Sequence, residues 1–387
     1  MGDKRELHVT RRSLVRRGSA VAAALAMPTY IRRAWAAEDT VTIMGLETAA
    51  LDDWSAFEKA AGVTIKFEVM NSHPGLFREE VIASAAGDRV DILLLAGGTA
   101  ERVSDKGLVP PLDGKEIPSW ARIPETVLGS PLAQGPAGTQ YGLPVVMNAD
   151  SFAYYPDELN EDEPLSYSVL FESEKTRGRV ALEDNWMTTF PMAASYVSTS
   201  GRHPVADPAD MTADEAKAVA DYLIERKKAG QFRSFWSSWE ESVSLLASKD
   251  VIAINCWEPA ALEVQKAGGA VRYATTVEGY NKWMICAYVP TQVVGRNKYG
   301  AVAKVLEGFL GGLYAARMAT RSGYATAIPE AGLAFAKEKN LPATEVAAIE
   351  ANIRKVSTKF AARQFWQTPA PKNMEAIKSE FSRFRNA

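Results

Sequence analysis

Two kinds of hydrophobic pattern alternate along most of this chain. Short runs rich in β-branched and apolar residues are typical of strands, and stretches that repeat apolar side chains every three or four residues are typical of amphipathic helices. The run 90–96 is almost continuously apolar, as expected for a strand buried on both faces of a sheet. Regular alternation predicts an α/β fold with largely parallel sheets. Strands are predicted at 41–44, 63–70, 90–96, 179–182, 251–257, 271–276 and 282–289.

Helices are predicted between these strands, and several carry recognisable start or stop signals. Leu51, Trp54 and Phe57 share one helical face, and Gly62 follows as a stop. Thr212 stands three residues before Glu215, the spacing of a capping box. The predicted helices are 50–61, 74–86, one from Ala100, 188–200, 213–229, 239–249, 258–267, 299–321, 343–361 and 373–385.

The N-terminal segment has the features of an export signal. Arg11 and Arg12 precede a weakly apolar run at 18–27, and Ala34-Trp35-Ala36 offers small residues at the spacing of a signal peptidase site. This arrangement resembles a twin-arginine signal covering residues 1–36. The apolar run is shorter than the ~20 residues that span a bilayer. We therefore expect a mature protein that begins near Ala37 and works in the periplasm.

Charge and length restrict what the mature chain does. Removing residues 1–36 takes away eight of 44 basic and two of 47 acidic residues, which changes the formal charge from −3 to −9. An acidic protein is a poor partner for nucleic acid or for an anionic membrane. We expect a chain that is not membrane-embedded and acts as a monomer. Its length exceeds that of one ordinary core, so two domains are predicted.

Residues that catalyse reactions or hold cofactors are scarce. The chain has three histidines and two cysteines, and no spacing typical of a metal site, a nucleophile elbow or a P-loop. We expect no metal, no cofactor and no catalysis, although a carboxylate-based hydrolase stays an alternative. Cys256 and Cys286 both lie in strand-like runs, where they form a disulfide in an oxidising compartment or remain two buried thiols.

A glycine-rich turn follows the most apolar strand. Gly97, Gly98 and Thr99 lead from that strand into the helix predicted from Ala100. In open α/β sheets, ligands bind at the carboxyl ends of strands, where backbone N–H groups at a helix start are exposed. The turn is therefore a candidate ligand contact, with a plain tight turn as the alternative.

Several motifs, in order along the chain, resemble the spermidine/putrescine-binding branch of the periplasmic solute-binding proteins of ABC importers. This resemblance implies a type II periplasmic binding protein fold, with two α/β domains, an interdomain ligand cleft and two crossover strands near 145–149 and 288–292. It implies no cofactor, and two partners: a small-molecule solute and an ABC transporter permease. The motifs are 90–99 (VDILLLAGGT), 141–144 (YGLP), 180–185 (VALEDN), 255–260 (NCWEPA), 278–284 (EGYNKWM) with Pro290, and 366–367 (WQ).

The resemblance also implies domain limits. The first lobe is expected to comprise residues 37–147, with 291–325 returning to it. The second lobe is expected to comprise 148–290, with 326–387 packing on it.

Ligand-binding residues are implied by the same resemblance. Trp257 and Trp283 match stacking tryptophans, which suit the methylenes and cationic ends of an amine. Gln367 and Asn185 match polar contacts. Glu47 and Asp150 fall near the ligand face of the first lobe, with a helix-cap acid and a turn acid as alternatives. The predicted ligand-binding set is Trp257, Trp283, Gln367, Asn185, Thr99, Gly98, Asp150 and Glu47.

Three departures from the family pattern affect the expected ligand. Asn185, Thr188 and Ile285 stand in register with carboxylates that bind ammonium groups in the family. Neutral residues there remove most of the electrostatic reason for a polyamine. We therefore expect a small polar or cationic solute rather than a polyamine itself. The alternatives are the exported hydrolase and an exported binding or sensor partner without a transport role.

Overall fold

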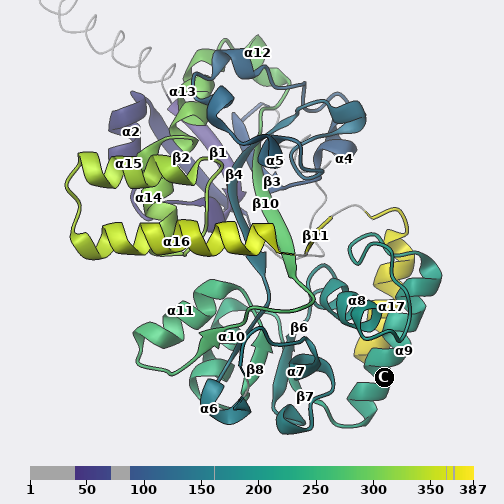
Figure 1. Cartoon of the computed structure of the whole chain (residues 1–387). Coiled ribbons are helices and arrows are strands. Elements are labelled where there is room, and N and C mark those ends of the chain that lie inside the picture. Colours follow the sequence, from purple (N-terminus) through teal and green to yellow (C-terminus); the bar gives the residue numbers. More distant parts are fainter. Residues whose placement is uncertain (1–39, 71–87, 161, 363, 369–370) are drawn as a thin grey trace, which may run out of the picture.

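A computed structural model describes residues 40–70, 88–160, 162–362, 364–368 and 371–387. The expected export signal and the helix predicted at 74–86 lie outside the described residues. Two mixed β-sheets, each with its own helices, form two α/β lobes, one above the other in Figure 1. The prediction of a two-lobed α/β fold is confirmed. In the described part of the chain, no helix combines the length and the apolar character needed to cross a bilayer.

The first lobe is built on a six-stranded sheet. Parallel strands β1, β2 and β3 lie at one side, and β10 pairs antiparallel with both β3 and β4. Its strands are β1 (Thr40–Leu46), β2 (Thr64–Met70), β3 (Ile92–Ala96), β4 (Gly142–Asp150), β10 (Tyr280–Tyr288) and β11 (Gln364–Trp366). Its helices are α2 (Ser55–Ala61), α4 (Ala100–Ser104), α5 (Glu125–Leu128), α12 (Gln292–Gly295), α13 (Tyr299–Phe309), α14 (Gly312–Arg321), α15 (Pro329–Glu338) and α16 (Ala343–Ala361).

The second lobe is built on a five-stranded sheet in the order β7-β6-β8-β5-β9. Strands β6, β7 and β8 are parallel, and β5 runs antiparallel to its neighbours. The strands are β5 (Phe152–Tyr154), β6 (Val180–Glu183), β7 (Phe232–Trp236), β8 (Ala253–Asn255) and β9 (Arg272–Tyr273). The helices are α6 (Pro156–Leu159), α7 (Ser168–Phe171), α8 (Thr189–Thr199), α9 (Ala213–Lys228), α10 (Trp239–Ala247), α11 (Glu258–Lys266) and α17 (Met374–Asn386).

Strands β4 and β10 form an antiparallel ribbon that leads from one lobe toward the other (Figure 1). β4 ends at Asp150, and β5 of the second sheet begins at Phe152. The return crossing lies between β9 and β10, at 274–279. The crossover expected near 288–292 is therefore misplaced, because β10 already pairs with β3 over 285–288. The Thr291 amide then donates to Leu108 O inside the first lobe.

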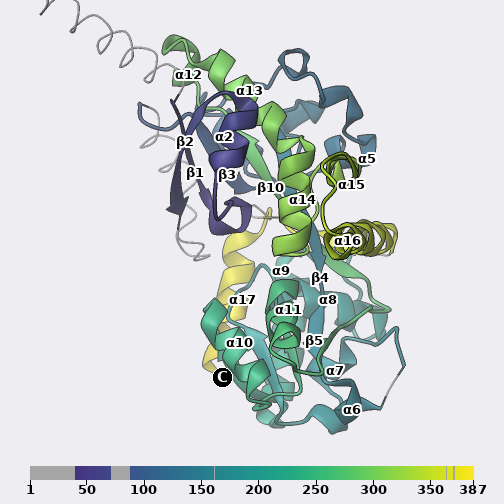
Figure 2. The ribbon, with the colours of Figure 1, turned by 90° about the vertical axis from the view of Figure 1, so that its left-hand side faces the viewer.

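The C-terminal segment divides between the lobes, contrary to the expectation that 326–387 packs on the second. Helices α15 and α16 pack against α14 and belong to the first lobe, and Val356 of α16 joins its core. Helix α17 packs on the second lobe, against α9 (Figure 2). Its Ile377, Phe381 and Phe384 are buried in the core of that lobe. Apolar periodicity gives α16 and α17 one buried face each but does not say which lobe covers it.

Local signals locate most elements well. The capping box of Thr212 and Glu215 is present at the start of α9. The helix predicted at 299–321 is two helices, because Gly311 has an extended backbone and ends α13 before α14. Strand β7 and helix α15 were not predicted; β7 has no clean alternation of buried and exposed side chains. Of the two alternatives for the cysteines, the structure has the buried thiols: Cys256 and Cys286 are free and lie in the cores of different lobes.

Candidate functional site

Four polar or aromatic side chains share one face of the β4–β10 ribbon, which we call the hinge face: Asn148, Asp150, Asn281 and Trp283. Asn281 is directly opposite Asp150, and Trp283 is directly opposite Asn148. Side chains of directly opposed residues point to the same side of a sheet, as do residues two apart on one strand. Trp283 is partly exposed, whereas the three polar residues are buried. Polar groups are therefore concentrated at the junction of the lobes.

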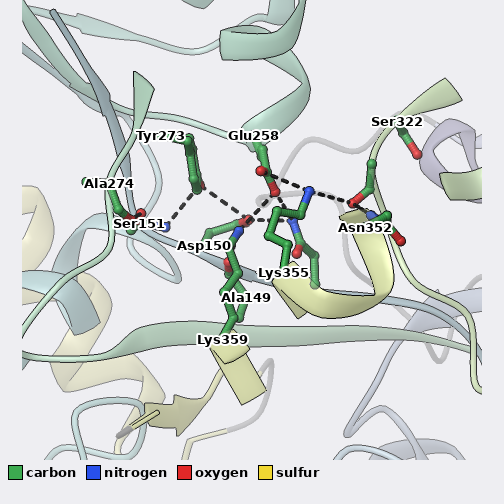
Figure 3. A network of polar contacts seen from close by, with 12 residues as sticks. Ala149, Asp150, Ser151, Glu258, Tyr273, Ala274, Ser322, Asn352, Lys355 and Lys359 are labelled. Carbon is green, nitrogen blue, oxygen red and sulfur yellow. Dashed lines mark hydrogen bonds and ion pairs between the residues drawn. The ribbon is translucent and has the colours of Figure 1, made fainter. Parts of the chain in front are cut away.

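Asp150 is the carboxylate of the hinge face. The indole Nε1 of Trp283 donates to its Oδ2 at 2.6 Å, and Asn148 Nδ2 donates to its Oδ1 at 3.4 Å. The Tyr273 hydroxyl lies 3.5 Å from the same Oδ1 (Figure 3). Burial raises the pKa of Asp150 to about 7, although the Lys359 charge and the Trp283 hydrogen bond act in the opposite direction. Nearby Glu258 and Glu183 add to the rise.

A second buried carboxylate, Glu183, ends strand β6 in the second lobe. Thr188 Oγ1 donates to its Oε2 at 2.6 Å, and Asn185 Nδ2 donates to its Oε1 at 3.0 Å. Burial raises the pKa of Glu183 to about 7, and the two hydrogen bonds only partly offset it. Among the described residues, neither Glu183 nor Asp150 has an ion-pair partner within 4 Å. Thus two buried acids are held by neutral donors.

Asn255 fixes the loop that carries Glu183. Its Oδ1 accepts from the Glu183 amide at 2.6 Å, and its Nδ2 donates to Thr189 Oγ1 at 2.8 Å. The Trp236 indole donates to the Asn255 carbonyl at 3.0 Å. One amide side chain at the end of β8 therefore holds the end of β6 and the start of α8 together. This arrangement restricts where the Glu183 carboxylate can lie.

The Glu183 loop is also joined to the ribbon. The Met187 carbonyl accepts from Asn281 Nδ2 at 3.4 Å and from Gln367 Nε2 at 3.2 Å. The Met187 amide donates to Asn185 Oδ1 at 3.0 Å. Two predicted site residues, Asn185 and Gln367, are thus brought together with the hinge face. Within the described part of the chain, two buried amide oxygens, Asn148 Oδ1 and Asn281 Oδ1, have no hydrogen-bond partner.

The predicted aromatic walls lie in different surroundings. Trp257 stacks on Trp239 with ring centroids 6.4 Å apart and meets the edge of Trp236 at 5.6 Å. Trp283 meets Tyr324 edge-on at 5.0 Å. Trp257 and Trp283 are both partly exposed. Each therefore retains an accessible part of its ring, unlike Trp236, which is fully buried.

The remaining predicted residues are separate from the two carboxylates. Gly98 has a φ of 84°, which suits a tight turn, and its amide donates to Leu132 O at 2.8 Å. The Thr99 hydroxyl donates to Ala96 O at 2.7 Å and is buried. Glu47 is exposed in the short 3-10 helix after β1. These hydrogen bonds of Gly98 and Thr99 stay within the first lobe.

Glu183, Glu258 and Tyr273 are polar residues of this region that sequence reasoning missed. Glu258 forms ion pairs with two lysines of α16, Lys355 at 3.0 Å and Lys359 at 2.9 Å (Figure 3). Glu183 directly follows the strand predicted at 179–182, and this position was a usable signal. The sequence around Glu258 contained no such signal, because the partners of Glu258 lie about a hundred residues away. The described residues contain no group of three His, Cys, Asp or Glu suited to a metal ion.

Comparison with known families gives a match to most of the chain. Residues 54–343 match the family model described as bacterial extracellular solute-binding protein. No curated protein matches the sequence.

Solved structures resemble this fold at low sequence identity. The spermidine/putrescine ABC transporter substrate-binding protein PotD from Streptococcus pneumoniae is 14% identical, with a TM-score of 0.70, covering 90% of this chain and 99% of its own. An ABC transporter substrate-binding protein from Bradyrhizobium japonicum is 19% identical, with a TM-score of 0.65, covering 89% of this chain and 99% of its own. MotA from A. tumefaciens, solved with glucopine, is 16% identical, with a TM-score of 0.61 and the same coverage of 89% and 99%. At these identities, the likeness concerns the fold.

Proposed function

Because the chain belongs to the bacterial extracellular solute-binding protein family, we propose that it captures a small solute between its lobes and delivers it to an ABC transporter permease. The two-lobed fold with a connecting ribbon supports this proposal, because a hinge allows closure around a ligand. Closure requires a solute that binds the closed state more tightly than the open one. Such a ligand has to contact both lobes.

The proposed binding region is the hinge face together with the Glu183 loop. One observation carries it: in the described part of this region, two buried acids lack an opposite charge, and two buried amide oxygens lack a donor. Among the described residues, Asp150 and Glu183 have no ion pair, and the side-chain oxygens of Asn148 and Asn281 have no hydrogen-bond partner. Buried acceptors require donors, and a buried charge requires an opposite one. We therefore propose a solute that presents a cationic N–H group.

Trp283 and Trp257 are the proposed aromatic walls, with Asn185 and Gln367 as polar neighbours. A partly exposed indole attracts a cation and covers apolar parts of a ligand. Gly98, Thr99 and Glu47 are proposed as a more peripheral part of the site on the first lobe. Their position after β1 and β3, at the carboxyl ends of parallel strands, supports this role.

Export, assembly and the lack of catalysis are proposals that follow from the same assignment. We propose that a twin-arginine signal directs the chain to the periplasm and is cleaved near Ala36, and that the mature protein acts as a monomer without turnover. Paired Arg11 and Arg12 support the export route. The alternatives are an exported carboxylate-based hydrolase and a binding partner without a transport role. Neither of them would deliver a solute to a permease.

A thermal-shift screen followed by calorimetry tests the function. The mature protein is mixed with amines, amino acids, neutral sugars and dicarboxylates at pH 8. We expect an amine-bearing compound to raise the melting temperature, because a ligand that binds only the folded state stabilises it by about 2.7 kcal/mol at one hundred times its Kd. The compound should be recovered unchanged after incubation. A hit confined to dicarboxylates would contradict the cationic assignment, and chemical conversion of the hit would favour the hydrolase.

A further inference from the structure

An ion triad joins the two lobes, and we call Glu258, Lys355 and Lys359 the lobe clamp. Glu258 is the first residue of α11 in the second lobe, whereas both lysines lie on α16, which packs on the first lobe. Glu258 Oε1 lies 3.0 Å from Lys355 Nζ, and its Oε2 lies 2.9 Å from Lys359 Nζ. The ion pairs therefore cross from one lobe to the other (Figure 3).

The clamp is shielded from solvent at its centre. Glu258 is 4% exposed and Lys359 is 5% exposed. Lys359 also donates to the Ala149 carbonyl at 3.0 Å, and Asn148 Nδ2 donates to Glu258 Oε2 at 3.4 Å. The clamp is thus bonded to the β4 strand at the hinge. Buried charges are tolerated when they are paired and hydrogen-bonded in this way.

Close packing accompanies the clamp at its outer end. Lys355 Nζ and Asn352 Nδ2 both donate to the Gly323 carbonyl. A Cβ atom on Gly323 would lie 3.1 Å from Leu262 Cδ1 of α11. A helix of the second lobe therefore contacts the turn after α14 in the first lobe. The lobes touch beside the clamp, so separating them there exposes the ions as well as apolar surface.

We propose that the lobe clamp holds the lobes together on the α11–α16 side before any solute binds, and that it thereby helps to set solute affinity. This inference rests on the proposed function only for its second part. A ligand that binds a closed state has an apparent Kd equal to its intrinsic Kd divided by the closed fraction. Losing the clamp therefore lowers affinity by reducing the closed fraction, and loss of the Glu258 contact with Asn148 of the hinge face adds to this effect.

The decisive variant is Glu258→Gln. It leaves the buried Lys359 and the half-buried Lys355 without their carboxylate, and hydration of the two ammonium groups then favours separation of the lobes. Spin labels at Glu338→Cys on α15 and Lys228→Cys on α9 report the distance between the lobes by double electron–electron resonance. Both label sites are exposed, and the native cysteines are buried. We expect a longer and broader distance distribution in Glu258→Gln without solute.

Two further variants distinguish the loss of the clamp from a general loss of stability. Adding Lys355→Met and Lys359→Met to Glu258→Gln removes all three charges and should restore most of the short distance. Asp91→Asn is the matched control, because Asp91 is fully buried and pairs with Arg296 at 3.1 Å and Lys298 at 3.4 Å inside the first lobe. It should lower stability and leave the interlobe distance unchanged.

The outcomes are distinct. An unliganded wild-type protein with the same long distance as Glu258→Gln overturns the proposal, and so does a Glu258→Gln protein that keeps the short distance. If Glu258→Gln does not fold, Lys355→Met, which keeps the pair of Glu258 with Lys359, should give an intermediate lengthening. Where a solute is known, its affinity should fall on the order of 100-fold in Glu258→Gln. The distances are measured without solute, so failure to find a ligand leaves this test intact.

Discussion

The Glu183 carboxylate gives the sharpest test of the proposed site. We replace it in Glu183→Gln, which keeps the size of the side chain and an oxygen that accepts from Thr188 or Asn185. The wild-type group is buried and has neutral donors only, and its pKa is raised from 4.5 to about 7. Glutamine has no charge at any pH. The variant therefore resembles the wild type with Glu183 protonated.

The sign of the pH dependence follows from the raised pKa. Between pH 4.5 and 7, the unfolded chain has lost the Glu183 proton while the folded chain keeps it, so raising the pH favours unfolding. The contribution to stability is full below pH 4.5 and is lost as the pH approaches 7. One pKa unit corresponds to 1.36 kcal/mol, so the loss for Glu183 is about 3 kcal/mol. Asp150 acts with the same sign in both proteins, and its contribution is smaller in the variant because the Glu183 charge no longer raises the pKa of Asp150.

Urea unfolding followed by tryptophan fluorescence at pH 5, 6, 7 and 8 measures the effect. We expect the stability of Glu183→Gln relative to wild type to rise by about 3 kcal/mol from pH 5 to pH 8. The control is Glu240→Gln, an exposed acid of the same lobe. A stability difference between Glu183→Gln and wild type that is the same at pH 5 and pH 8 refutes the reasoning. A cationic solute should release protons on binding to wild type near pH 7, and fewer on binding to the variant.

Three further predictions concern other parts of the chain. Trp283→Ala and Trp257→Ala should each weaken solute binding by roughly ten- to a few hundred-fold, since stacking and apolar burial are both lost. Calorimetry measures the affinity. A collapse of stability with unchanged affinity would identify the two tryptophans as core residues. Asn255→Ala should lower the free energy of unfolding by about 2–4 kcal/mol, because it removes two buried hydrogen bonds. Asn255 accepts one of them from the Glu183 amide and donates the other to Thr189. A change below ~0.5 kcal/mol in urea unfolding would contradict this prediction. Arg11→Lys with Arg12→Lys should stop delivery to the periplasm, assayed by cell fractionation, and unchanged delivery would indicate the general secretory route.

Local sequence patterns were sufficient for most strands and helices. The apolar run of β3, the capping box of α9 and the apolar face of α16 each depend on neighbouring residues, so short windows of sequence contain the signal. The same holds for Trp283, which lies in the strand predicted at 282–289, whereas the place of Asp150 was indicated by the family resemblance and not by a predicted strand. The hydrogen bond between Trp283 and Asp150 was not predictable from short windows, because it joins residues 133 positions apart.

Long-range pairing decided what the sequence left open. Inserting β10 between β4 and β3 sets the point of return from the second lobe, and it separates Cys286 from Cys256. The position of α16 over α11 creates the lobe clamp, although nothing near Glu258 in the sequence indicates two lysine partners. Amphipathic helices and strands of similar pattern can cover more than one surface. The sequence by itself determined which faces are apolar, and only the tertiary structure decided which partner buries each face, because the free energy of burial depends on area and not on the identity of the covering element.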